Sequence, residues 1–226
     1  MFEVGDLERL LEIMREGGVV GVLITGALII LVRDWRVTLL ALLGQYVMVG
    51  IVLLQLTSPE IALIKVLVGA LICLMLYLAA RQSGWGVLSR ADVALVTSSG
   101  DSISNERDPL PWISIAFRAL VMSLVFVLAL QLGRDYPLPD VPPDVGLGCY
   151  WLMLVGLMVL MLTEWPLLAG PGLLTALTGF ELFYTPLESS LIVTFLLAMV
   201  NLLLAVAISY LAAVQGLNPL REGSRD

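Results

Sequence analysis

The chain contains no histidine among its 226 residues, and lysine occurs only once, at position 65. The absence of histidine removes the commonest catalytic base and metal ligand of proteins. The only two cysteines, Cys73 and Cys149, lie in or at apolar runs, so the sequence predicts neither a disulfide framework nor a metal site. With a formal net charge of −7 and no run of basic residues, the chain is not expected to bind nucleic acid.

Catalytic fingerprints are missing as well. The sequence contains no P-loop, no dinucleotide-binding fingerprint and no Gly-x-Ser-x-Gly elbow around a nucleophile. We therefore expect the chain to bind no cofactor and to be non-catalytic on its own. The open alternative for an enzymatic role is that it is one subunit of a redox-driven, proton-translocating complex.

Charge is scarce and apolar residues dominate. Only 14% of the residues are charged while 59% are hydrophobic, and the mean hydropathy is +0.98. An average soluble domain is roughly half apolar and a quarter charged. Runs such as 37–56 and 61–80 each match the ~20 residues that cross a bilayer core of ~30 Å. The sequence predicts an all-α, polytopic transmembrane helical bundle embedded in a lipid bilayer.

Apolar windows between charged or Pro/Gly breaks predict about seven spans. The windows are 17–32, 37–56, 61–80, 112–132, 148–165, 167–184 and 187–214. The fifth and sixth leave two interpretations open, because Glu164-Trp165-Pro166 and Gly170-Pro171-Gly172 interrupt one long apolar stretch. That stretch is either two helices or one broken helix.

The organisation expected from these windows starts with a segment rich in acidic residues. Such a segment is unlike a signal peptide, which is basic at its start, and 7–14 within it has the pattern of a short surface helix. The expected parts are an amphipathic N-terminal segment (1–16), a first three-helix membrane unit (17–80), a cytoplasmic loop (81–110), a joining transmembrane helix (111–132), an outer Pro-rich loop (133–147), a second three-helix membrane unit (148–215) and a polar C-terminal tail (216–226).

The arginines predict the orientation, because short cytoplasmic loops retain positive charge. With seven spans, one side holds seven arginines and the other holds three. The seven are Arg33, Arg36, Arg81, Arg90, Arg107, Arg221 and Arg225, and the three are Arg9, Arg15 and Arg134. We expect a multi-pass protein of a prokaryotic-type inner (cytoplasmic) membrane, with the N-terminus outside and the C-terminus in the cytoplasm.

The two three-helix units show signs of an internal repeat. The third helix of each unit opens with a Ser/Thr-Pro start, at Ser58-Pro59 and Thr185-Pro186. Each also closes with Tyr-Leu-Ala-Ala, at 77–80 and 210–213. The register between the two copies slips, so a true repeat and a chance match both stay open at this point.

Lys65 and Glu181 are the leading candidates for chemistry, because a charge at mid-bilayer costs ~2.5–3.5 kcal/mol even on lenient scales. Lys65 lies inside the third window between Ile64 and Val66, and Glu181 lies in the sixth. A desolvated lysine or carboxylate exchanges protons readily, which suits a proton path. The alternatives are that Lys65 snorkels to an interface or pairs for structure alone, and that Glu181 faces water at a span end.

Weaker candidates accompany them. Glu60 falls in the first turn of a helix after Ser58-Pro59, where a carboxylate is ordinary helix-start chemistry. Gln45 and Asn201 are amides within apolar windows, able to support buried water or to hydrogen-bond a neighbouring helix. Arg118, six residues into the fourth window, favours a structural role. The predicted proton or ion path is therefore Lys65 and Glu181, supported by Gln45, Glu60 and Asn201.

A family resemblance rests on short stretches of the first half. Asp34-Trp35-Arg36, Leu43-Gly44-Gln45-Tyr46 and Ile64-Lys65-Val66-Leu67-Val68-Gly69 occur in order, and the third window closes with Ala79-Ala80-Arg81. Together they resemble the membrane component E of hydrogenase-4-type complexes. That family in turn resembles the three-helix K-type subunit of complex I and the C-type subunit of multisubunit Na⁺/H⁺ antiporters.

Residues in the second half of the chain also match the motif of the K-type subunit. Its Gly-x-Glu is matched by Gly179-Phe180-Glu181, whereas Gln45 or Tyr46 stands in place of the first-half glutamate. Where its third helix carries a second glutamate, this chain has Lys65 and Asn201. The resemblance implies a membrane subunit of a complex-I-like or group-4-hydrogenase-like complex, with other integral membrane subunits as partners and a buried proton or Na⁺ path. A scaffolding subunit and a self-contained transporter remain the alternatives.

Overall fold

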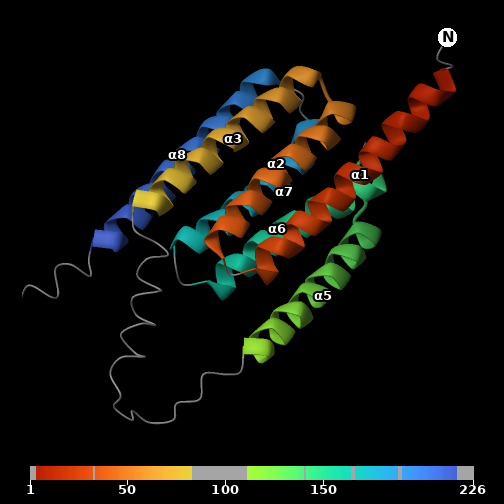
Figure 1. Ribbon diagram of the computed structural model, residues 1–226. Coiled ribbons are helices and arrows are strands. Elements are labelled where there is room, and N and C mark those ends of the chain that lie inside the picture. Colours follow the sequence, from red (N-terminus) through yellow and green to blue (C-terminus); the bar gives the residue numbers. More distant parts are fainter. Residues whose placement is uncertain are drawn as a thin grey trace, which may run out of the picture.

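A computed structural model describes residues 4–32, 34–82, 111–139, 141–163, 166–187 and 190–217 of the chain. Throughout these ranges the regular secondary structure is α-helical, as expected (Figure 1). The helices are α1 (Val4–Leu31), α2 (Trp35–Leu56), α3 (Pro59–Gln82), α5 (Pro111–Asp135), α6 (Pro143–Leu162), α7 (Pro166–Leu187) and α8 (Leu191–Leu217). Each of the seven apolar windows overlaps one of these helices.

Six of these helices are long and apolar enough to cross a membrane, all except α7. In α7 the apolar run is interrupted by three threonines and Glu181, together with glycine and proline residues. Helices suit a bilayer because they satisfy every backbone N–H and C=O within the segment. The part of the chain that the structure describes is thus an all-helical membrane protein, and α7 is the helix whose apolar run is too interrupted to qualify as a span.

The side chains that face outward support the same conclusion. Large apolar residues on α3, α5 and α8 are well exposed, among them Leu67, Leu124 and Ile192. Buried polar residues, in contrast, lie inside the bundle, including Gln45 and Asn201. An apolar exterior around polar interior groups is the pattern of a protein whose solvent is lipid.

Several helix boundaries differ from the expectation. The short surface helix expected over 7–14 is not separate, because α1 runs unbroken from Val4 into the first span. The outer loop expected over 133–147 is shorter, since α5 continues to Asp135 and α6 begins at Pro143. Proline at the first helical position and Asp144 in the first turn are favourable helix-start chemistry, which the apolar windows did not register.

The structure also bears on the apolar stretch with two interpretations and on the expected loop and tail. Residues 143–162 and 166–187 form two separate helices that pack against each other, so the broken-helix alternative does not apply. The expected cytoplasmic loop 81–110 and polar tail 216–226 lie outside the described residues, apart from their first two positions each, which end α3 and α8.

The helices pack as two rows of three. One row is α1, α2 and α3, the other is α6, α7 and α8, and each helix contacts its counterpart, α1 with α6, α2 with α7 and α3 with α8. α3 and α8 run side by side in the same direction at one edge of the bundle (Figure 1). α5 lies at the opposite edge and contacts α6 and α1. This arrangement places the middle helices, α2 and α7, in the core.

Candidate functional site

Three polar side chains meet between α3, α7 and α8. Lys65 lies six residues after the start of α3 at Pro59, and Glu181 lies six residues before the end of α7 at Leu187. At ~1.5 Å per residue, both are ~9 Å inside their helices. Asn201 is ten residues into α8, which follows α7 directly in the chain. Although Asn201 lies further along its helix than the other two residues, the three side chains are in contact, through an ion pair and a hydrogen bond.

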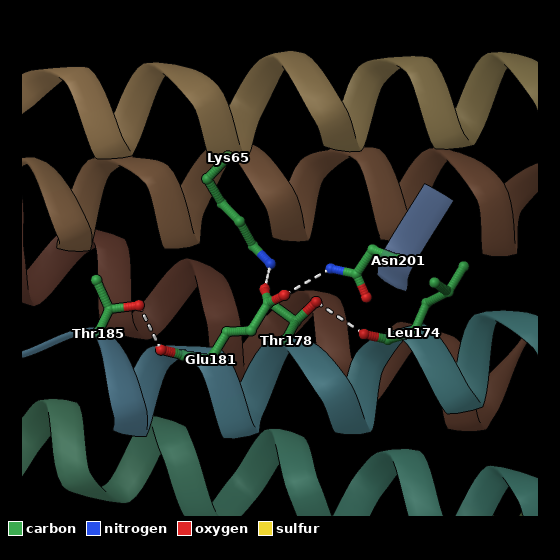
Figure 2. Close-up of polar contacts among 6 residues, drawn as sticks. All are labelled: Lys65, Leu174, Thr178, Glu181, Thr185 and Asn201. Atoms are coloured by element: carbon green, nitrogen blue, oxygen red, sulfur yellow. Dashed lines mark hydrogen bonds and ion pairs between the residues drawn. The ribbon is translucent and has the colours of Figure 1, made fainter. Parts of the chain in front are cut away.

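The carboxylate of Glu181 is the centre of the group (Figure 2). Its Oε2 forms an ion pair with Lys65 Nζ, and its Oε1 accepts a hydrogen bond of 2.7 Å from Asn201 Nδ2. The exposed fractions are 8% for Lys65, 5% for Glu181 and 1% for Asn201. The two charges therefore neutralise each other inside the protein, and the second carboxylate oxygen is bound by the Asn201 amide.

A buried ion pair of this kind costs much to desolvate and is retained only where its geometry and hydrogen bonds are good. Inside a membrane the cost is higher still, and intramembrane charges are typical of ion and proton pathways. The Asn201 amide supplies the extra hydrogen bond that such a pair requires. The sequence had left snorkelling open for Lys65, and the structure instead places its ammonium inside the bundle.

A small cavity adjoins the ion pair. Its space for the centre of a water molecule is about 20 Å³. The polar side chains that line it are Lys65, Glu181, Thr185, Thr194 and Asn201, and apolar residues of α2, α3 and α8 complete the wall. A cavity needs roughly 10–15 Å³ on this measure to hold one water molecule and two to four polar groups to bind it. The cavity meets both conditions.

Tyr46 of α2 also lies beside Lys65. Its side chain is fully buried, and Lys65 Nζ lies 5.2 Å from the centre of its ring, a distance typical of a cation–π contact. The ring packs directly on Gly69 of α3, where a Cβ atom would collide with it. Gly69 therefore permits the approach of α2 and α3 that brings the Tyr46 ring over Lys65.

Gln45 belongs to a second polar contact, between α2 and α7. Thr175 Oγ1 donates a hydrogen bond of 3.3 Å to Gln45 Oε1, and both side chains are fully buried. Gln45 Nε2 has no hydrogen-bond partner among the described residues. Gln45 thus lies in the same bundle core as the ion pair and links α2 to α7, and its hydrogen bond in the described part of the chain goes to Thr175 and not to Lys65 or Glu181.

Thr175→Val is expected to destabilise the protein by about 1 kcal/mol, because it removes this hydrogen bond between helices while keeping the side-chain volume. Thr25→Val is the matched control, since the hydrogen bonds of Thr25 Oγ1 stay within its own helix, to Gly21 O at 2.8 Å and to Val22 O at 3.2 Å. The measurement is reversible unfolding of both variants in the same detergent. Equal losses for the two variants would contradict a role for the α2–α7 hydrogen bond.

Glu60 is not part of the group. It is exposed in the first turn of α3, whereas Lys65 on the same helix is buried. Arg118 contacts another helix, as its Nη1 donates a hydrogen bond of 3.1 Å to Ile30 O and so connects α5 to α1. The structure brings together Lys65, Glu181 and Asn201, places Gln45 nearby in the core, and leaves Glu60 at the helix end.

The sequence interpretation overlooked the threonines of α7. Thr175, Thr178, Glu181 and Thr185 follow one another at spacings of three, three and four residues, which places them on one helix face. Thr178 and Thr185 each donate a hydrogen bond of 2.7 Å to a carbonyl of their own helix, Leu174 O and Glu181 O (Figure 2). The spacing was a readable signal, because it marks a polar stripe on an otherwise apolar helix.

Metal ligation finds no support in the described ranges, which hold no group of three or more His, Cys, Asp or Glu side chains able to bind a metal ion. Cys73 and Cys149 are both buried free thiols. The polar chemistry near the ion pair is therefore that of an ammonium, a carboxylate, amides and hydroxyls.

Comparison of the chain with models of protein families, with curated proteins and with solved structures finds no match. The class of the protein follows from fold and site alone. It is a polytopic helical membrane protein with an ion pair of opposite charges buried between three of its helices.

Proposed function

We propose that the chain is a membrane subunit of a complex-I-like or group-4-hydrogenase-like ion-translocating complex and contributes part of a buried proton or Na⁺ path. The observation that carries the proposal is the Lys65–Glu181 ion pair, bound by Asn201 and adjoining a cavity large enough for water. Transfer of one proton from the ammonium to the carboxylate converts the pair to two neutral groups. Such a pair can hold a proton in either of two places.

The packing of the helices supports the internal repeat in this proposal. The two three-helix units, α1–α3 and α6–α8, lie as parallel rows with counterparts in contact. The Ala80–Ala212 contact joins the two Tyr-Leu-Ala-Ala segments that ended the expected copies. We therefore infer two copies of a three-helix unit joined through α5, with seven spans, the N-terminus outside and the C-terminus in the cytoplasm of a prokaryotic-type inner membrane.

The partners in this proposal are other integral membrane subunits. A path through one small chain is useful only if it continues into neighbouring subunits, and the exposed apolar faces of α3, α5 and α8 provide surfaces for lipid or for such subunits. In this proposal Gln45 and Asn201 support water along the path inside the bundle. Glu60, exposed in the first turn of α3, lies where the path opens at the end of that helix.

Translocation by the assembled complex tests the proposal. Lys65→Ala and Glu181→Ala are each expected to lower the rate at least roughly tenfold, since losing a proton-transfer group commonly costs more than that. Asp144→Ala is the matched control, because it removes a carboxylate whose pair with Arg15 is about one-third exposed, at another place in the bundle. Wild-type translocation by assembled Lys65→Ala and Glu181→Ala complexes would refute the proposed function.

The competing function is a non-conducting subunit that scaffolds a larger assembly. The direct contact between Lys65 and Glu181 favours it, because a paired charge can hold α3 and α7 together without moving any proton. A scaffold predicts that the Lys65→Met/Glu181→Leu double variant assembles and translocates normally, whereas a proton path predicts assembly without normal translocation.

A further inference from the structure

The cavity beside the ion pair has the composition of a site for a small cation. Its oxygen-bearing side chains are Glu181 and Thr185 of α7 and Thr194 and Asn201 of α8. Carboxylate, amide and hydroxyl oxygens are the ligands that hard cations prefer. Both threonine hydroxyls donate to carbonyls of the chain, Thr185 to Glu181 O and Thr194 to Ser190 O, which leaves their oxygen lone pairs to bind a cation.

Asn201 provides an independent indication of a ligand. Its Nδ2 is used in the bond to Glu181, but its Oδ1 is buried without a hydrogen-bond partner in the described part of the chain. Leaving a buried polar atom unpaired costs free energy, so such atoms usually have a partner or a function. Asn201 also lines the cavity, and an amide oxygen is a ligand that hard cations accept.

Charge determines which cation fits. Lys65 and Glu181 are the two charged residues that line the cavity, so with the ammonium in place the site is neutral. Without the ammonium it carries a single negative charge inside an apolar bundle. A monovalent cation would neutralise that charge, whereas a divalent cation would leave an uncompensated positive charge, which is costly at this depth.

We propose that Glu181, Asn201, Thr185 and Thr194 form a site for one monovalent cation, and that the Lys65 ammonium occupies it as a tethered cation. When Lys65 gives up one proton and becomes a neutral amine, a free alkali cation can enter, so that one positive charge replaces another. Proton and alkali cation thus exclude each other at this site. The inference rests on the proposed function, because it names the two ions that compete for one site in the proposed path.

The test is cation-dependent stability of the purified full-length chain in lipid nanodiscs. Lys65→Ala removes the tethered ammonium and leaves room for a cation. At mildly alkaline pH and equal ionic strength, its thermal midpoint is expected to rise by about 4 °C in NaCl or NH₄Cl relative to choline chloride, whose cation is too large for the cavity. Wild-type protein is expected to show no difference, because its site is already occupied.

Two further variants complete the experiment. Lys65→Ala/Glu181→Gln removes the charge that attracts the cation and is expected to lose the response. Leu67→Ala, an exposed position on the same helix, is the control for truncation of α3 and is expected to show none. If Lys65→Ala does not fold in any of the three salts, Lys65→Gln is measured in the same way with the same expectation.

Equal midpoints of the Lys65 variant in all three salts would overturn the inference, as would an equal gain by the double variant. No translocation is measured in this experiment. A cation response together with normal translocation by Lys65→Ala complexes would refute the proposed function and leave the cation site standing. Impaired translocation without a cation response would refute the cation site and leave the proposed function standing.

Discussion

Glu181→Leu is expected to destabilise the protein by about 3–5 kcal/mol, because it leaves the Lys65 ammonium buried without its counter-charge. Leucine fills a volume similar to that of glutamate, so the loss reports the charge and little of the packing. Lys65→Met is expected to cost a comparable amount, since it leaves the Glu181 carboxylate unpaired. The measurement is reversible unfolding in mixed micelles, followed by helical circular dichroism.

The double variant Lys65→Met/Glu181→Leu is the decisive member of this set. Replacing both members of a buried pair with apolar residues of similar size is often neutral or stabilising. We therefore expect the double variant to recover most of the loss and to lie within about 1 kcal/mol of wild type. Additive losses in the double variant would show that the two residues act independently, contrary to the ion pair in the structure.

Gly156→Val is expected to have the second-largest effect, a loss of about 3 kcal/mol or failure to fold. α6 and α7 pack closely at this point, and a Cβ on Gly156 would collide with the backbone nitrogen of Ala176 and with the carbonyl oxygen of Gly172. Backbone atoms cannot move aside as a flexible side chain can, so the helices would have to separate. The measurement is the same unfolding experiment.

Gly17→Ala is the matched control for that prediction. Gly17 also lies within a helix, α1, but a Cβ there would have no neighbour within 4 Å. Alanine has the higher helix propensity, so this variant is expected to be neutral or more stable by up to about 1 kcal/mol. A loss by Gly17→Ala similar to that of Gly156→Val would mean that helix flexibility, rather than close packing, explains both.

The helices themselves were largely predictable. Apolar runs of about 20 residues have few structural options in a bilayer, so each window became a helix. The predicted helix boundaries were wrong where they depend on properties other than hydropathy. The start of α6 depends on Pro143 and Asp144, which are favourable at a helix start although neither is strongly apolar.

The members of the site were individually visible, but their association was not. Lys65 and Glu181 were notable because each is a charge within an apolar window, which is a local property of the sequence. Their pairing depends on the contact of α8 with both α3 and α7, which joins segments far apart in the chain. Gln45 and Thr175, separated by 130 residues, meet for the same reason.

By itself the sequence determined that this is a helical membrane protein, which apolar segments form its helices and which charges within them need a partner. These follow from local composition, since a lipid solvent selects for helices and against unpaired charge. Only the tertiary structure decided that Lys65 lies against Glu181, that Asn201 completes the pair, and that a cavity adjoins it. The physical reason is that helix packing, through close contacts such as Gly69 with Tyr46, depends on side-chain shapes that no single segment specifies.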